Sequence, residues 1–289
     1  MPPRLGALLA VVFWGVSFVA TKQAVTEISP TTVIFTRTGI GTLILCAILA
    51  LRRQPVLPPR DALGALALMG FVGVAFHQLL QAYALTLTSA VSTGWLIGLI
   101  PVWSALLAAV LLHERFGPRK IAGLVVGFTG ALLVVTRGRL GARLLALPST
   151  RGDLLVLAST VNWALYTVLG HGTIRRLGPT RATAGAMLLG WVMLAPPFVA
   201  RAGWSEYARL SVPGWSALLF LGVAASALGY LFWYGALERV DASRVAALLY
   251  LEPLVTLAAG MVLLAEPVGV TTVAGGLLVL GGVLLVQTG

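Results

Sequence analysis

The chain has 289 residues, of which 58% are hydrophobic and only 10% are charged, and its mean hydropathy is +0.96. Soluble proteins carry about 25% charged residues, so this composition excludes a water-soluble domain and indicates an integral membrane protein. The net charge of +11 does not require nucleic acid as a partner, because basic residues collect in the cytoplasmic loops of membrane proteins.

Ten apolar stretches, bounded by proline, glycine and charge, follow one another along the chain. Ten spans of about 20 residues occupy about 200 positions and leave only short loops. The sequence therefore predicts an all-α integral membrane fold with ten transmembrane helices. We expect these helices near residues 5–22, 31–51, 62–85, 89–112, 120–136, 152–170, 182–200, 215–237, 243–265 and 268–286.

The distribution of basic residues predicts the orientation of these spans. With the N-terminus in the cytoplasm, 12 Lys and Arg residues fall on the inner side and 7 on the outer side. Because positive charge is retained inside, we expect both termini to be cytoplasmic. The loop around residues 137–151 opposes this bias, since it puts four arginines outside.

An internal repeat divides the chain into two halves. Residues 110–117 and 262–269 match at five of eight positions with an offset of 152, and an offset of 149 aligns Trp14 with Trp163. We therefore expect one repeat over residues 1–145 and a second over 146–289. Five spans per repeat force opposite orientations, which is the inverted plan of secondary transporters with a site between the halves.

Several motifs resemble those of a known family. The run from Phe13 to Ala20, Ile28-Ser29-Pro30 and Arg37 are similar to the opening of one domain of the drug/metabolite transporter superfamily, in its ten-helix, two-domain (EamA-type) branch. The runs 251–254 and 263–267 resemble the end of the second domain. The resemblance implies a multi-pass carrier of the cell inner membrane that exports small metabolites, and it is strongest to bacterial aromatic amino acid exporters.

Polar and aromatic side chains within the spans are candidates for lining a central cavity. The offset of 152 aligns Gln78 with Tyr230 and Gln81 with Trp233, so two related helices place such groups at matching depth. The alternatives are hydrogen bonds that only hold helices together and aromatic belts at the lipid headgroups. The predicted substrate-binding residues are Trp14, His77, Gln78, Gln81, Asn162, Trp163, Tyr166, Tyr230, Trp233 and Tyr234.

Two charged residues, Arg37 and Glu252, fall inside predicted spans. Arg37 can either extend its side chain to the outer interface as an anchor or bind a substrate carboxylate. Its counterpart in the second half is Ala186. Glu252 precedes Pro253 and can relay a proton or satisfy backbone groups that the proline leaves free.

The absent motifs narrow the function. The sequence has no Gly-x-x-x-x-Gly-Lys-Ser/Thr phosphate-binding loop, so we expect that ATP is not the direct energy source. We also expect no cofactor. The histidines lack metal-ligand spacing, and Cys46 is the single cysteine, so no metal site is expected. No nucleophile and base are clustered at bilayer depth, which argues against an intramembrane enzyme.

The sequence thus predicts a secondary carrier that exports amino acids, aromatic or large hydrophobic ones first, by alternating access. The alternatives are the same fold moving a nucleoside, sugar or cation, or a passive channel. The expected partners are the small-molecule substrate and the lipid bilayer, without nucleic acid. Glycine-rich faces either join two helices within a monomer or form a dimer interface; they contain Gly123, Gly127, Gly130, Gly275, Gly276, Gly281 and Gly282.

Overall fold

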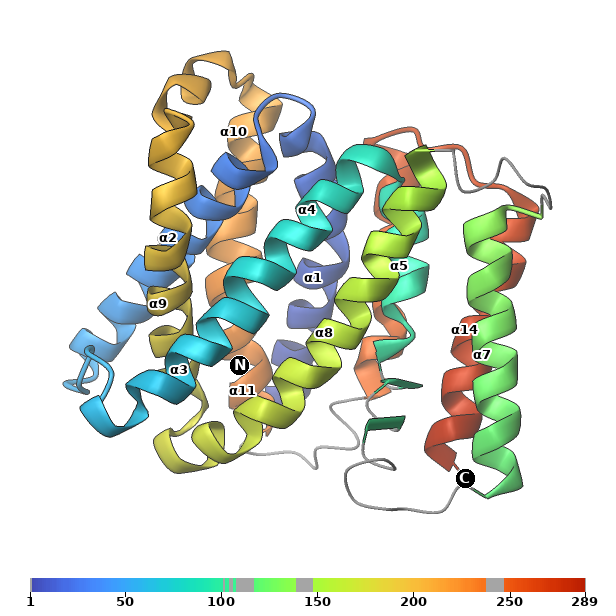
Figure 1. Ribbon diagram of the computed structural model, residues 1–289, viewed down its shortest axis with the longest axis horizontal. Helices are drawn as coiled ribbons and strands as arrows, with labels where there is room; N and C mark the ends of the chain where they lie inside the picture. Colours follow the sequence, from blue (N-terminus) through green and yellow to red (C-terminus); the bar gives the residue numbers. More distant parts are fainter. Residues whose placement is uncertain are drawn as a thin grey trace.

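A computed structural model describes residues 2–100, 102–103, 106–107, 117–138, 148–237 and 247–288. Within these ranges every regular element is helical (Figure 1). The first half contains α1 (Pro3–Val25), α2 (Pro30–Leu51), η1 (Arg60–Ala62), α3 (Leu63–Met69), η2 (Gly70–Phe76), α4 (His77–Leu87), α5 (Ala90–Ile97) and α7 (Pro118–Thr136). The second contains α8 (Pro148–Leu177), α9 (Pro179–Ala200), η4 (Gly203–Arg209), α10 (Val212–Leu219), η5 (Phe220–Leu228), α11 (Gly229–Leu237), η6 (Ala247–Leu251), α13 (Glu252–Leu263) and α14 (Val270–Thr288).

The helices are long and apolar enough for a multi-pass membrane protein. Six stretches of the described chain meet the length and hydropathy of a membrane span, and two shorter apolar helices accompany them. The helix α8 is longer than the predicted span of 152–170, because it continues through Arg175 and Arg176 to Leu177. The predicted fourth and ninth spans extend beyond the described residues.

Local sequence signals explain where several helices begin. Pro30, Pro118, Pro148 and Pro179 each open a helix, where the missing proline N–H costs no hydrogen bond. Ser29, Ser89 and Ser211 act as N-caps for α2, α5 and α10 through their side-chain oxygens.

The elements η1, η4 and η6 are short 3-10 helices, and two further stretches have π-helical geometry. The segments η2 and η5 are π-helical, and each lies inside a longer helix, between α3 and α4 and between α10 and α11. Adding the repeat offset of 152 to the range of η2 gives residues 222–228, which fall within η5. The unusual geometry therefore recurs at the same place in both halves.

The main helix pairs join the first half of the chain to the second. The helix α1 packs against α11, and α8 packs against α4. Likewise α2 packs against η5, and α9 packs against η2. Each half thus supports its partner rather than forming a separate bundle.

The glycine-rich helices α7 and α14 lie side by side at one edge of the molecule (Figure 1). A Cβ atom added at Gly130 would lie 2.5 Å from the carbonyl oxygen of Gly275, and one added at Gly282 would meet the backbone of Gly127. These glycines therefore let the backbones of α7 and α14 approach closely within one chain.

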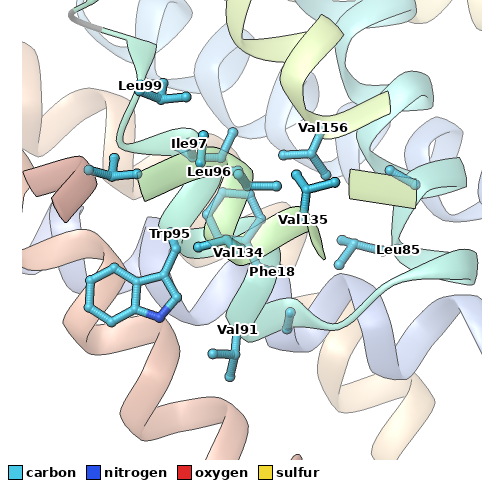
Figure 2. Packing of buried hydrophobic residues seen from close by; sticks show 14 of the residues in the cluster. Phe18, Leu85, Val91, Trp95, Leu96, Ile97, Leu99, Val134, Val135 and Val156 are labelled. Atoms are coloured by element: carbon cyan, nitrogen blue, oxygen red, sulfur yellow. The ribbon is translucent and has the colours of Figure 1, made fainter. Parts of the chain in front are cut away.

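The largest apolar cluster surrounds α5. Trp95 has no solvent-exposed surface and contacts Gly276 of α14, and Val134 and Phe18 belong to the same cluster (Figure 2). This cluster connects the α7–α14 pair to the rest of the bundle.

Candidate functional site

Seven of the ten residues predicted to line a cavity fall into two groups, which we call the histidine cluster and the tryptophan cluster. The histidine cluster consists of His77 and Gln81 on α4 with Ser159, Trp163 and Tyr166 on α8. The rings of His77 and Trp163 are 4.9 Å apart between centroids, and those of Trp163 and Tyr166 are 5.0 Å apart. Gln81 Nε2 donates to Ser159 Oγ at 3.3 Å.

His77 is the most buried polar residue of the histidine cluster after Ser159, with 4% of its surface exposed. Its Nδ1 atom makes no hydrogen bond to any part of the chain that the structure describes. An unsatisfied buried nitrogen is unfavourable. His77 therefore retains an unused hydrogen-bonding position inside the bundle.

The tryptophan cluster consists of Trp14 on α1 with Tyr230 and Trp233 on α11. The centroid distances from Trp14 are 5.6 Å to Tyr230, in an edge-on arrangement, and 5.2 Å to Trp233, with tilted rings. Trp14 Nε1 donates to the carbonyl oxygen of Ala225 in η5 at 3.1 Å. These contacts combine aromatic packing with one polar group that fixes the indole.

The two clusters are built in the same way. In each, a tryptophan from the first helix of one half meets the helix that follows the π-helical segment of the other half. Trp14 contacts α11, and Trp163 contacts α4, and these two tryptophans are the pair aligned by the offset of 149. π-Helical segments occur frequently at functional sites.

The remaining predicted residues have different positions. Asn162 Nδ2 donates to the carbonyl oxygen of Val72 in η2 at 2.8 Å, so its amide links two helices. Gln78 is half-buried on α4. The side chain of Tyr234 lies outside the described part of the structure.

Arg37 is buried on α2, with 6% of its surface exposed. Its Nε donates to Ser226 Oγ at 3.3 Å and its Nη1 to Thr21 Oγ1 at 3.5 Å. The side chain therefore points into the bundle, between α1 and η5. This buried position does not fit a side chain that extends to the outer interface as an anchor.

Glu252 opens α13 and is half-buried. Its backbone carbonyl accepts a hydrogen bond from Thr256 Oγ1 at 3.0 Å, and the same hydroxyl donates to the carbonyl of Gly15 at 2.9 Å. Among the residues described, its carboxylate has no hydrogen bond or ion pair. The Thr256 hydroxyl thus links α13 to α1, next to Glu252.

Sequence reasoning missed a charged network at one end of the bundle, which we call the end network. It surrounds a cavity of about 310 Å³ lined partly by Lys22, Thr88, Arg137 and Glu266. Lys22 Nζ donates to the carbonyls of Leu85 and Thr88 at 2.6 and 2.7 Å. Such a cation stabilises the C-terminal end of α4.

Two acidic residues, Glu266 and Asp153, also belong to the end network. Glu266 accepts from the backbone N–H groups of Ala90 and Val91 at 2.8 and 3.0 Å, at the start of α5. Asp153 is fully buried and lies 3.2 Å from Arg137. The repeat aligns Glu266 with Glu114, which marks Glu266 as a residue of interest. The sequence alone does not indicate which groups either glutamate contacts.

The helices and their buried polar clusters define a multi-pass helical membrane protein. Among the described residues, no group of His, Cys, Asp and Glu is suited to hold a metal ion. The chain belongs to the EamA-like transporter family, whose sequence pattern matches residues 2–136 and again residues 150–288. It is therefore a transporter and not an enzyme.

Individual relatives agree with this family. An uncharacterized transporter of Archaeoglobus fulgidus is 33% identical over 279 residues, which cover 96% of each chain. A protein of Streptantibioticus cattleyicolor named a probable terminal-alkyne amino-acid exporter is 29% identical over 283 residues, covering 97% of this chain and 91% of its own. One crystal structure of a protein described without a function has a TM-score of 0.66 and 21% identity, covering 99% of this chain and 96% of its own. That last likeness shows a shared fold.

Proposed function

We propose that this transporter exports amino acids with aromatic or large hydrophobic side chains from the cytoplasm by alternating access. The observation that carries the proposal is the pair of aromatic clusters around Trp14 and Trp163. Aromatic walls with a few polar groups are the usual composition of a small-molecule site. Ring contacts contribute about 0.5 to 1.5 kcal/mol per pair beyond burial, which favours aromatic substrates.

The architecture we propose has ten transmembrane helices in two inverted repeats, residues 1–145 and 146–289. The two matches to the family pattern and the recurrence of the π-helical segment support a duplication. The reciprocal packing of α1 on α11 and α8 on α4 supports a twofold relation between the halves. In such carriers the substrate lies between the repeats, and each repeat alternately takes the shape of the other.

We propose that both termini lie in the cytoplasm, because the excess of Lys and Arg falls on that side, and contacts between loops support the grouping of the loops on two opposite faces. Asp61 pairs with Arg176 at 3.2 Å, and both lie in segments expected on the inner side. Glu27 and Ser211, from segments expected on the outer side, also meet, at 2.7 Å. The relative named as an amino-acid exporter supports the direction and substrate class of transport.

Proteoliposomes provide the test. Radiolabelled amino acids, a nucleoside, a sugar and an organic cation are offered to the purified chain with and without a pH gradient. We expect phenylalanine, tryptophan or leucine to be transported, and a response to the gradient identifies proton coupling. Transport of only the sugar, nucleoside or cation would contradict the proposed substrate class.

Matched tryptophan variants locate the site. Trp163→Ala removes the ring that contacts His77 and Tyr166, and we expect transport to fall about tenfold or more, with Trp163→Phe retaining part of it. Trp204 is 54% exposed, so Trp204→Ala serves as the control and retains transport. Normal transport by folded Trp163→Ala would place the site elsewhere.

A further inference from the structure

The guanidinium of Arg37 is a buried cation without an anionic partner. Among the described residues, its N–H groups donate to only two acceptors, the hydroxyl oxygens of Ser226 at 3.3 Å and of Thr21 at 3.5 Å. No carboxylate comes within ion-pair distance of it in the ranges that the structure describes. A guanidinium has five N–H donors, so most of its hydrogen-bonding capacity is not used by these contacts.

This arrangement is costly unless the cation has a role. Removing a charge from water into a low-dielectric interior carries a desolvation penalty that two neutral hydroxyls offset only in part. Ionisable residues kept at such positions in membrane proteins commonly lie on a substrate path. A carboxylate ligand restores the balance, because it accepts two parallel hydrogen bonds from one guanidinium.

The surroundings of Arg37 join the two clusters of the proposed site. Ser226, which accepts from Arg37, lies one residue after Ala225, which accepts from Trp14. Tyr230 of the tryptophan cluster and His77 of the histidine cluster are both close enough to interact electrostatically with Arg37. A ligand carboxylate at Arg37 would therefore lie near η5, the segment that Trp14 of the tryptophan cluster also contacts.

We propose that Arg37 binds the carboxylate of the transported substrate and so determines that substrates are carboxylates with an aromatic or large apolar side chain. This inference rests on the proposed function, and it names the residue that selects the class of substrate. Amines that lack a carboxylate are then poor substrates, because their binding would leave Arg37 unpaired beside a second cation.

Only one half of the protein provides such a group. The position equivalent to Arg37 is Ala186, which is 1% exposed. Its carbonyl oxygen would lie 2.6 Å from a Cβ added at Gly70, so backbone occupies the space around it. The repeat therefore supplies a carboxylate-binding arginine at this position in the first half only.

Competition during uptake of radiolabelled phenylalanine tests the inference. The competitors are 3-phenylpropionate, which has the carboxylate without the amine, and phenethylamine, which has the amine without the carboxylate. In the unaltered protein we expect 3-phenylpropionate to compete and phenethylamine to have little effect. Equal competition by the two compounds would overturn the inference while leaving amino-acid transport intact.

Variants of Arg37 separate binding from a structural role. We expect Arg37→Gln to raise the KM for phenylalanine about tenfold or more and to abolish competition by 3-phenylpropionate, because a charge-assisted hydrogen bond is lost. Arg37→Lys should keep part of both properties. An equal loss of transport for all substrates without a change in KM or in competition would assign Arg37 to structure alone.

Two further measurements cover other outcomes. If Arg37→Gln does not fold, Ser226→Ala removes one of the two contacts that position the guanidinium, and we expect about a threefold rise in KM with kcat unchanged; an unchanged KM would count against the inference. If the unaltered protein moves no amino acid, the proposed function fails. The carboxylate site can then still be tested by measuring whether 3-phenylpropionate raises the unfolding temperature of the detergent-solubilised protein. No stabilisation by 3-phenylpropionate would contradict the inference.

Discussion

Glu27 accepts hydrogen bonds from both the backbone N–H and the hydroxyl of Ser211, each at 2.7 Å, across 184 positions of sequence. The relation is reciprocated, because Glu206 accepts from the backbone N–H of Ser29 at 2.7 Å. Ser29 and Ser211 are the N-caps of α2 and α10. Glu27, in the loop between α1 and α2, thus binds the N-cap residue of α10. Glu206, in the segment before α10, binds the N-cap residue of α2.

The Glu27 carboxyl group gives this end of the bundle a pH dependence. Its slight burial acts to raise its pKa, but hydrogen bonds from Ser211 and Gln23 outweigh this effect and hold the pKa below its ordinary value of 4.5. A carboxyl group with a depressed folded-state pKa contributes stability that is present above pH 4.5 and is lost as the pH falls through the folded value.

We therefore expect the midpoint of thermal unfolding to fall less on acidification in Glu27→Gln than in the unaltered protein. Because the side chain is only partly buried and solvent screens it, the difference amounts to about 0.5 kcal/mol. Thermal unfolding in detergent from pH 3 to 7 measures it. Identical pH profiles for the two proteins would show that these hydrogen bonds contribute no net stability.

The ion pair between Asp153 and Arg137 should matter more than an exposed pair. Asp153 has no exposed side-chain surface and also accepts from Thr88 Oγ1 at 2.5 Å. Asp153→Ala leaves a partly buried arginine without its partner, and we expect a loss of about 2 kcal/mol in the free energy of unfolding.

The pair of Asp61 and Arg176 supplies the matched control. Both side chains are at least half exposed, at 73% and 50%, so Asp61→Ala should cost under about 0.5 kcal/mol. Thermal unfolding in one detergent compares the two variants. Equal losses would mean that the end network contributes no more than a surface ion pair.

Close packing of α7 on α14 predicts a sharp contrast between two glycines. Gly130→Ala puts a Cβ within 2.5 Å of the carbonyl oxygen of Gly275, and we expect a loss of about 2 kcal/mol or more from the forced separation of backbones. A Cβ at Gly281 meets nothing within 4 Å. Gly281→Ala should therefore be neutral or stabilising by up to about 1 kcal/mol. Thermal unfolding checks both, and a neutral Gly130→Ala would refute the packing described for this pair.

The proposed inversion of the two repeats is tested by labelling equivalent positions. Thr26 and Arg175 are both exposed and are aligned by the offset of 149. In a Cys46→Ser background, Thr26→Cys should react with a membrane-impermeant maleimide from outside the cell. Arg175→Cys should react only after the cytoplasmic side is opened. Labelling of both positions from one side would show that the repeats run parallel.

The sequence predicts the helical content and several helix starts well, because apolar stretches and prolines act locally. The match between the predicted span of 120–136 and α7 is an example. It also singled out Trp14 and Trp163 as an aligned pair. It could not assign their partners, because the contacts with α11 and α4 depend on how distant segments pack.

Three features lie beyond what local patterns encode. The π-helical geometry of η2 and η5 leaves no distinct signature in a run of apolar residues. Lys22, Asp153 and Glu266 sit near helix ends, where a charge is usually solvated, and only the fold turns them inward. The burial of Arg37 depends in the same way on Thr21 and Ser226, which come from other helices.

The widened turns of η2 and η5 have a mechanical implication. A helix turns by about 100° for each residue, so taking up or releasing one residue within such a turn swivels every later side chain by about that angle while the axis stays in place. Tyr230 and Trp233 lie downstream of η5, and His77 and Gln81 lie downstream of η2. Gaining or losing one residue in either segment would therefore rotate these groups toward or away from the interior of the bundle.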